Sequence, residues 1–429
     1  MAKLKMKYNL NTLKNGLRVI TVPIKGLASA TVTIWVKTGS RLEEARTSGI
    51  SHFLEHMVFK GSKKRPSAKE IAEAIDAIGG EFNAGTSKDW TNFFIKTRAE
   101  NLDKAFDVLS DMVINPLLKK EEIEREKGVI VEEIKMYEDT PMMRIGDIFE
   151  ELVFSGSPLG RDIAGTESTV KGIKRNDFLR YRSIHYYPEN MLVTVAGGVS
   201  SKESEGLAGK YFMGLSSRKA KYTYKRFESK QTQPLTKLHG KKKEQAHFIL
   251  GFRGNGRDYQ GRFAETVLAT ILGGSASSRL FIEVRERRGL AYAIKTSADR
   301  YNDTGYMATQ AGVDTQRVEE AIKVTLDEHY KLANKTKPIS KGELVRAKEF
   351  LKGHTALALE DTKDVNGFFG EQGLFLKEIL TPEEVFKKID KVSIDEVLSE
   401  ANKLFKPERL NLAIIGPYED ENRFQKLLR

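Results

Sequence analysis

Apolar and polar residues follow two different periods along the chain, which predicts a mixture of strands and helices. Short apolar runs predict strands at 17–22, 30–36, 91–96, 191–196, 246–252 and 410–415. Apolar residues three and four positions apart predict helices, including 67–78, where Ser67 and Glu70 fit a capping box. Because strands and helices do not alternate strictly, we predict an α+β fold with antiparallel-rich sheets packed against helices.

The two halves of the chain have the pattern of a diverged internal repeat. Segments 30–41 and 246–257 are both apolar strands that lead into a glycine turn. Pairing Arg41 with Arg257 lays residues 52–56 over 268–272 without a gap. A polar, basic segment typical of a connection lies between the halves. We therefore predict an N-terminal domain at 1–215, a linker at 216–235 and a C-terminal domain of similar fold at 236–429.

Length and composition restrict the possible classes of protein. The 429 residues are enough for two domains of about 200 residues each. The chain contains no cysteine, which excludes disulfide bonds, thiolate metal ligands and cysteine nucleophiles. The first residues lack the apolar core of a secretory signal, and no run of about 18 apolar residues follows. We therefore expect a cytoplasmic protein that has no contact with membranes.

The formal net charge of +12 raises nucleic-acid binding as an alternative. The densest basic runs are 218–226, which also contains Tyr222 and Tyr224, and 241–243. The excess is mostly lysine spread among 59 acidic residues, and no nucleic-acid motif accompanies it. This pattern favours a solvated surface, and we predict no nucleic-acid partner.

Residues 48–59 predict one helix with chemistry on one side, opened by Thr47 or Ser48. Its apolar positions follow the helical period and form a single face, while His52, Glu55 and His56 lie on the other side. Two histidines one turn apart can both reach one zinc ion at about 2.0–2.1 Å. Zinc lowers the pKa of a bound water to about 7, and the neighbouring carboxylate can then take its proton. The alternative is a helix whose polar side faces solvent and binds nothing.

A catalytic zinc site needs a third protein ligand, and a carboxylate is favoured here. Residues 120–138 predict a long charged helix with the apolar stripe Ile123, Ile130, Ile134 and Tyr137. Glu126 and Glu133 lie together on the flank of that stripe, whereas Glu132 points away. Glu133 is therefore the better candidate, although a helix that is simply rich in surface glutamate has the same composition.

These residues belong to longer motifs that resemble a known family. The chain resembles the pitrilysin-type zinc metallopeptidases, and within them bacterial members similar to the catalytic subunit of mitochondrial processing peptidase. The resemblance extends over essentially the whole chain. The matching motifs are Gly49-Ile50-Ser51-His52-Phe53-Leu54-Glu55-His56-Met57, Phe82-Asn83-Ala84, Glu124-Arg125-Glu126, Val131-Glu132-Glu133-Ile134, His185-Tyr186-Tyr187-Pro188 and Arg288-Gly289-Leu290-Ala291-Tyr292.

The resemblance implies a role for each of these site residues. One Zn²⁺ per chain would be held by His52, His56 and Glu133, with Glu55 as general base. Glu126 would orient a ligand or tune the site. Arg285 and Tyr292 match a pair that contacts substrate and the developing oxyanion.

The resemblance also implies a substrate class and partners. Two such chains would close like a clamshell around a chamber, so the protein would be an endopeptidase acting on unfolded peptides, as a homodimer or as a heterodimer with a related subunit. Phe82, Asn83 and Ala84 would lie on the strand to which a substrate peptide adds. The alternative is a noncatalytic family member that acts as a scaffold or partner subunit.

Overall fold

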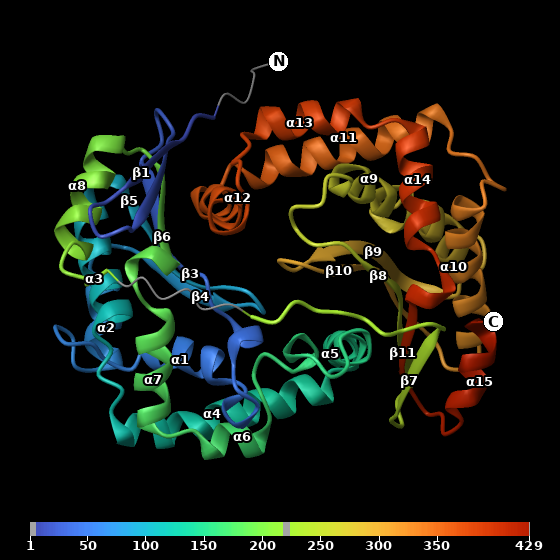
Figure 1. Ribbon diagram of the computed structural model, residues 1–429, viewed down its shortest axis with the longest axis horizontal. Coiled ribbons are helices and arrows are strands. Elements are labelled where there is room, and N and C mark those ends of the chain that lie inside the picture. The colour runs from blue at the N-terminus through green and yellow to red at the C-terminus, as the bar shows by residue number, and fades with distance from the viewer. Residues whose placement is uncertain (1–5, 218–223, 429) are drawn as a thin grey trace. The chain divides into compact units, whose positions relative to one another are not determined.

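The computed structural model describes residues 6–217 and 224–428, which divide into two compact units. The first unit comprises the described parts of Met1–Lys135, Arg161–Lys225 and Thr355–Glu384. The second comprises the described parts of Met136–Gly160, Arg226–His354 and Val385–Arg429. Each unit contains one mainly antiparallel sheet with helices packed on it (Figure 1). The predicted α+β class with two similar domains is confirmed.

The sheet of the first unit has six strands in the order β1-β2-β6-β3-β5-β4. Their bounds are Asn9–Thr12 (β1), Arg18–Pro23 (β2), Ser29–Val36 (β3), Glu81–Thr86 (β4), Thr91–Arg98 (β5) and Met191–Gly197 (β6). Strands β2 and β6 are parallel, and the other neighbours are antiparallel. The order ends at β4 on one side, so β4 is an edge strand within the described part of the chain.

Helices cover both faces of this first sheet. Ala30, Val32 and Ile34 of β3 belong to the same hydrophobic cluster as residues from α1 (Ile50–Val58), α3 (Leu102–Ile114) and α8 (Ser201–Phe212). On the other face, Trp35 packs with residues of α12 (Thr362–Phe375). Because both faces are covered, the central strands β3 and β6 are almost continuously buried and apolar.

The second sheet repeats this topology with five strands in the order β7-β11-β8-β10-β9. Their bounds are Leu235–Gly240 (β7), Gln245–Gly254 (β8), Ala291–Arg300 (β9), Gly305–Asp314 (β10) and Leu410–Gly416 (β11). The parallel pair β7 and β11 corresponds to β2 and β6. The register that pairs Arg41 with Arg257 lays Ser29–Val36 over 245–252, which is β8, and 52–56 over part of α9 (Arg262–Gly273).

The two units exchange chain segments, and here the structure differs from the continuous domains predicted at 1–215 and 236–429. The helix α5 (Pro141–Val153) comes from the first half of the sequence but packs on the second sheet. Conversely, α12 comes from the second half and packs on the first sheet. Each sheet has two apolar faces that need cover, and each half of the chain supplies helices from its own sequence for only one of them. The predicted linker, 216–235, lies partly outside the described residues.

Further helices complete each unit. In the first unit they are α2 (Ala68–Asp76), α4 (Lys120–Asp139, whose last turn is assigned to the second unit), α6 (Glu167–Gly172) and α7 (Arg175–His185). Those that begin in the second half are α10 (Val318–Ala333), α11 (Lys341–Ala358), α13 (Pro382–Lys391), α14 (Ile394–Leu404) and α15 (Glu421–Gln425). Within the described ranges, every helix is too short or too polar to cross a bilayer.

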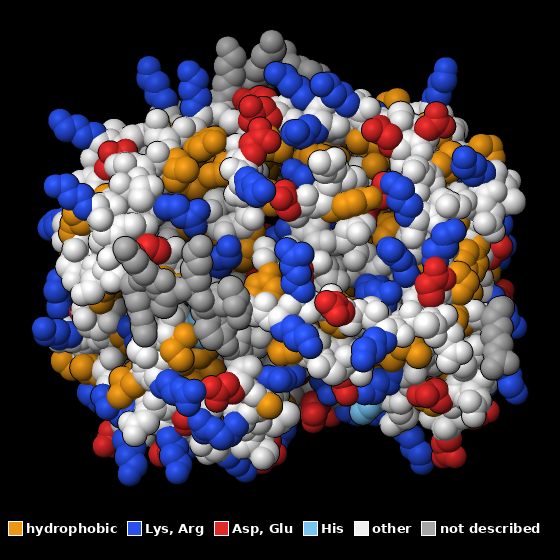
Figure 2. Space-filling view, in the orientation of Figure 1, with side chains coloured by type: hydrophobic (Ala, Val, Ile, Leu, Met, Phe, Trp, Pro, Cys, Tyr) orange, Lys and Arg blue, Asp and Glu red, His pale blue; other side chains and the backbone are white. Residues whose placement is uncertain are grey.

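The surface charge is dispersed rather than gathered. On the face shown in Figure 2, lysine and arginine side chains are spread widely and interspersed with aspartate and glutamate. This distribution is consistent with a solvated surface, as the sequence suggested.

Candidate metal centre

Helix α1 presents its two sides to different surroundings, as its sequence predicts. Ile50, Phe53, Leu54, Met57 and Val58 are at most 1% exposed and pack in the core of the first unit. His52, Glu55 and His56 lie on the other side, and all three are partly exposed. The prediction that Thr47 or Ser48 caps this helix is wrong, because Gly49 occupies the N-cap position with a φ of +95°.

Three side chains converge beside α1. His52 Nε2 lies 3.7 Å from Glu133 Oε1, and His56 Nε2 lies 3.6 Å from Glu133 Oε2. The two imidazole rings have their centroids 4.6 Å apart. One ligand atom from each of the three residues lies within 4.8 Å of the other two, and no other group of three potential ligands in the described chain does so. Two imidazole nitrogens and one carboxylate are the donors that zinc favours in a catalytic site, so this group fits the metal.

The protonation of these ligands depends on burial and on their neighbours. Burial, with a smaller contribution from the charge of His56, lowers the pKa of His52 to about 4. His52 is therefore neutral at pH 7, as a metal ligand must be. Burial is also the largest influence on His56, but the hydrogen bond to Glu126 and the nearby carboxylates outweigh it and raise the pKa of His56. Burial raises the pKa of Glu133, and the charges of Asp162 and Glu126 act in the same direction.

Glu126 lies on α4, seven residues before Glu133, and contacts the ring nitrogen of His56 that faces away from Glu133. His56 Nδ1 and Glu126 Oε1 are 2.9 Å apart, and Lys60 Nζ lies 2.6 Å from Glu126 Oε2. Burial opposes ionisation of Glu126, but these two bonds lower its pKa overall. A carboxylate in this place fixes the ring of His56 and leaves Nε2 directed toward Glu133. The role of Lys60 was not predicted, although its position one turn after His56 is a usable signal.

Glu55 is held by the edge strand β4. The hydroxyl of Thr86 donates a hydrogen bond of 2.5 Å to Glu55 Oε2. Burial raises the pKa of Glu55, although the bond from Thr86 and the charge of His56 act in the opposite direction. A carboxylate with a raised pKa is suited to accept a proton near neutral pH. The sequence alone does not indicate this contact of Thr86, because it depends on how β4 packs on α1.

The predicted substrate-binding residues lie along β4. Phe82, Asn83 and Ala84 pair with Ile95, Phe94 and Phe93 of β5 on one side. Phe82 is 37% exposed, and its ring lies 5.5 Å from that of Phe59 at the end of α1. In the described part of the chain, β4 is paired on one side only, and Thr86 at its end contacts Glu55 of α1.

Arg285 and Tyr292 are brought together in the second unit. The guanidinium carbon of Arg285 lies 5.2 Å from the ring centroid of Tyr292, which is 81% exposed. Arg285 belongs to a π-helical turn at Phe281–Glu286.

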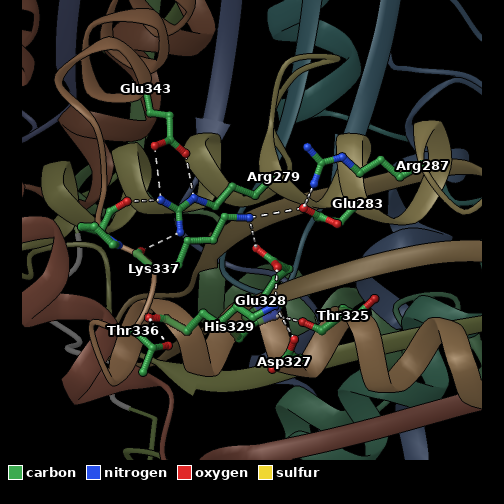
Figure 3. Close-up of polar contacts among 12 residues, drawn as sticks. Arg279, Glu283, Arg287, Thr325, Asp327, Glu328, His329, Thr336, Lys337 and Glu343 are labelled. Atoms are coloured by element: carbon green, nitrogen blue, oxygen red, sulfur yellow. Dashed lines mark hydrogen bonds and ion pairs between the residues drawn. The ribbon is translucent and has the colours of Figure 1, made fainter.

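An ionic network anchors that turn (Figure 3). Arg279 donates to both carboxylate oxygens of Glu343 and to the carbonyl oxygens of Lys337 and Pro338. Glu283 accepts from Arg287 and Lys337 (Figure 3). It also accepts from Arg288. The segment around Arg285 is therefore held by the ion pairs of two buried side chains, Arg279 and Glu283.

Comparison with protein families identifies two matching regions. Residues 18–167 match the model described as insulinase (peptidase family M16), and residues 172–351 match the model described as peptidase M16 inactive domain. The three candidate ligands His52, His56 and Glu133 all lie in the first region, and Arg285 and Tyr292 lie in the second.

Individual relatives cover almost the whole chain. A zinc protease of Streptomyces coelicolor is 35% identical over 421 residues, which cover 96% of this chain and 90% of that protein. The zinc protease YmxG of Bacillus subtilis is 36% identical over 412 residues, with coverage of 95% and 97%. Among solved structures, a protease from Helicobacter pylori superimposes with a TM-score of 0.91 at 27% identity, covering 96% of this chain and 100% of that one. A peptidase M16 inactive domain from Pseudomonas fluorescens has the same fold, with a TM-score of 0.89 at 17% identity and coverage of 97% and 99%.

Proposed function

Since the chain belongs to the insulinase family of peptidases, family M16, we propose that it is a zinc-dependent endopeptidase. The observation that carries the proposal is the convergence of His52, His56 and Glu133 within 4.8 Å, with Glu55 on the same side of α1. The names of the relatives, which are zinc proteases, support the same metal.

The chemistry follows from the placement of these groups. Zinc in such a site acts as a Lewis acid, polarising a carbonyl group and making water a better nucleophile at neutral pH. His52, His56 and Glu133 would hold the ion. Glu55 takes the proton from the attacking water at Oε1, because its Oε2 is occupied by Thr86. It then delivers that proton to the leaving amine.

The substrate is an extended peptide. Among the described strands, β4 pairs with β5 alone, so its outer edge can receive an added strand, and Phe82, Asn83 and Ala84 lie along that edge. Main-chain pairing requires an unfolded segment and makes few demands on sequence. Arg285 and Tyr292 would donate hydrogen bonds to the substrate and to charge that develops on its carbonyl oxygen.

The assembly and compartment belong to the same proposal. Two chains would close as a clamshell around a chamber that admits only unfolded peptides. We favour a homodimer, because one chain carries both the metal residues and the Arg285–Tyr292 pair. A heterodimer with a related subunit is the other arrangement. We place the protein in the cytoplasm.

The proposal is tested by metal analysis and peptide hydrolysis on the same purified protein. We expect about one zinc per chain, activity that a chelator removes, and recovery on addition of zinc. Glu55→Gln keeps the ligands but removes the base, so it should retain zinc and lose activity by ~100-fold or more. His52→Ala and Glu133→Ala should lose the metal. Undiminished hydrolysis by Glu55→Gln would contradict this mechanism, and a wild-type protein that binds zinc but cleaves no peptide would indicate the scaffold alternative.

A further inference from the structure

The N-terminus of α1 is capped by a side chain from outside the helix. Glu43 follows the 3₁₀ turn Ser40–Leu42 and is only 5% exposed. Its Oε2 accepts from the main-chain N–H of Gly49 at 2.7 Å, and its Oε1 accepts from the N–H of Ser51 at 2.8 Å. One carboxylate therefore binds the first turn of the metal helix at two points.

Helix α1 has no means of capping itself. Its N-cap is Gly49, whose φ of +95° favours glycine. A Cβ atom at this position would overlap the carbonyl group of Ala164, so no larger residue fits. The first N–H groups of any helix lack partners within it. In α1, Glu43 supplies partners that residue 49 cannot provide.

A second set of hydrogen bonds holds the first turn of α1. The hydroxyls of Ser51 and Tyr181 are 2.7 Å apart, and those of Tyr181 and Thr38 are 2.8 Å apart. Ser51 and Thr38 have no exposed surface, and Tyr181 is 7% exposed. Together with Glu43, these bonds fix both the position of the first turn and its rotation about the helix axis.

The two zinc-binding histidines are oriented by different means. His56 has Glu126 on its Nδ1, which sets the direction of the ring. The Nδ1 of His52 is buried and meets no hydrogen-bonding protein group among residues 6–217 and 224–428. Metal-bound histidines are normally oriented through the nitrogen that does not bind the metal. The place of His52 is therefore set by the main chain, and the preceding residue, Ser51, is the one that Glu43 holds.

We propose that Glu43 is a positioning residue that places His52 for zinc binding through the main chain of α1. The proposal rests on the function proposed above, because it requires that His52 binds zinc. It predicts that replacing Glu43 weakens zinc binding even in a variant that still folds.

The test compares Glu43→Gln with Glu44→Gln. Both variants replace a carboxyl group with an amide at adjacent positions, but Glu44 is exposed and pairs with Arg180 instead of with α1. Zinc affinity is measured on the metal-free proteins by competition with a chromogenic chelator, at a temperature where circular dichroism shows each to be folded. We expect Glu43→Gln to bind zinc about 10- to 100-fold more weakly, the usual effect of losing a group that orients a ligand. Glu44→Gln should match the wild type.

Hydrogen exchange on the metal-free protein gives a second readout. The amides of Gly49 and Ser51 should exchange faster in Glu43→Gln, while amides of α10, which belongs to the second unit, remain unchanged. If Glu43→Gln does not fold, Glu43→Asp is tested by the same measurements, since its shorter side chain keeps the carboxyl group but cannot reach both amides.

The outcomes separate the two proposals. Zinc affinity in the folded Glu43 variant equal to that of the wild type would overturn the role of Glu43 and leave the peptidase proposal intact. Failure of the wild-type protein itself to bind zinc would overturn both.

Discussion

The two oxygens of Glu55 have different surroundings, and this difference bears on how the carboxylate acts. Oε2 accepts the hydroxyl of Thr86, which lies at the end of β4. The bond ties the proposed base to the strand that would bind substrate. A base held in this way keeps its other oxygen directed toward the attacking water, and such alignment contributes to rate only if it is maintained in the transition state.

Replacing Thr86 tests this positioning. Thr86→Val keeps the shape of the side chain but removes the donor, so we expect kcat for peptide hydrolysis to fall about 10- to 100-fold, since a hydrogen bond to a charged group contributes ~1.5–3 kcal/mol. KM should change little, because β4 would bind peptide through its main chain. Thr86→Ser retains the hydroxyl and should recover most of the wild-type kcat. A Thr86→Val enzyme with the kcat of the wild type would show that the bond has no role in the reaction.

The sequence predicts a site residue when its contacts are local in the chain and misses it when they depend on packing between distant segments. His52, Glu55 and His56 share one helix, so their proximity follows from the helical period. The helical period also favoured Glu133 over Glu132, and Glu132 is indeed exposed on α4, with 73% of its side chain accessible. Glu43 and Thr86 come from segments that reach α1 only through packing. The sequence around each gives no period or spacing from which that contact could be inferred.

Among the elements, burial on both faces made the central strands easy to predict. β3, β6, β8 and β11 are apolar runs because helices cover both sides of them. The strands β9 and β10 were not predicted. β9 lies at the edge of its sheet and alternates buried with exposed residues, several of them polar, so its sequence lacks a continuous apolar run. The helices predicted at 48–59, 67–78 and 120–138 all form, with ends that differ by at most two residues.

The contact between α12 and the first sheet can be tested with two glycines on one helix. A Cβ at Gly370 would overlap the indole ring of Trp35, whereas a Cβ at Gly367 meets no atom within 4 Å. Gly370→Ala should therefore lower the free energy of unfolding of the first unit by ~1–3 kcal/mol through overpacking. Gly367→Ala should raise it by up to ~1 kcal/mol, because alanine favours a helix.

Tryptophan fluorescence reports unfolding of the region around α12 selectively. The chain has two tryptophans, Trp35 and Trp90, and both pack in the cluster that contains α12 residues. Denaturant titrations followed by fluorescence should show a lower midpoint for Gly370→Ala only. Equal midpoints for the two variants would mean that α12 does not pack on Trp35 as described.

For the whole molecule, the internal repeat explains why the two domains have similar folds, although only the first contains the candidate metal ligands. The two sheets share a strand order, yet residues 268–272 of α9 are Leu-Ala-Thr-Ile-Leu where α1 carries His52, Glu55 and His56. The sequence could predict the repeat from a register of matching strands. It could not predict that α5 and α12 exchange between units, because each is amphipathic or apolar enough to cover either sheet, and periodicity does not specify which one.

The proposed dimer makes a prediction about complementation between chains. If the metal residues of one chain act with Arg285 of its partner, a mixed dimer of Glu55→Gln and Arg285→Ala chains contains one intact site. At equal amounts and random exchange, such a mixture should recover about a quarter of the wild-type activity, because half of the dimers are mixed and each has one of its two sites intact.

A matched mixture provides the control for this experiment. Combining Glu55→Gln with His52→Ala places both defects in the same half of the site, so every dimer lacks an intact metal centre and activity should stay at background. Subunit exchange is verified by mass spectrometry of chains with different isotopic labels. If exchange is complete and the first mixture is as inactive as the control, Arg285 acts within its own chain or not at all, and complementation between chains is excluded. Recovery of activity in the first mixture but not in the control would mean that the two domains of each chain carry different parts of the active site. Dimerisation would then bring those parts together.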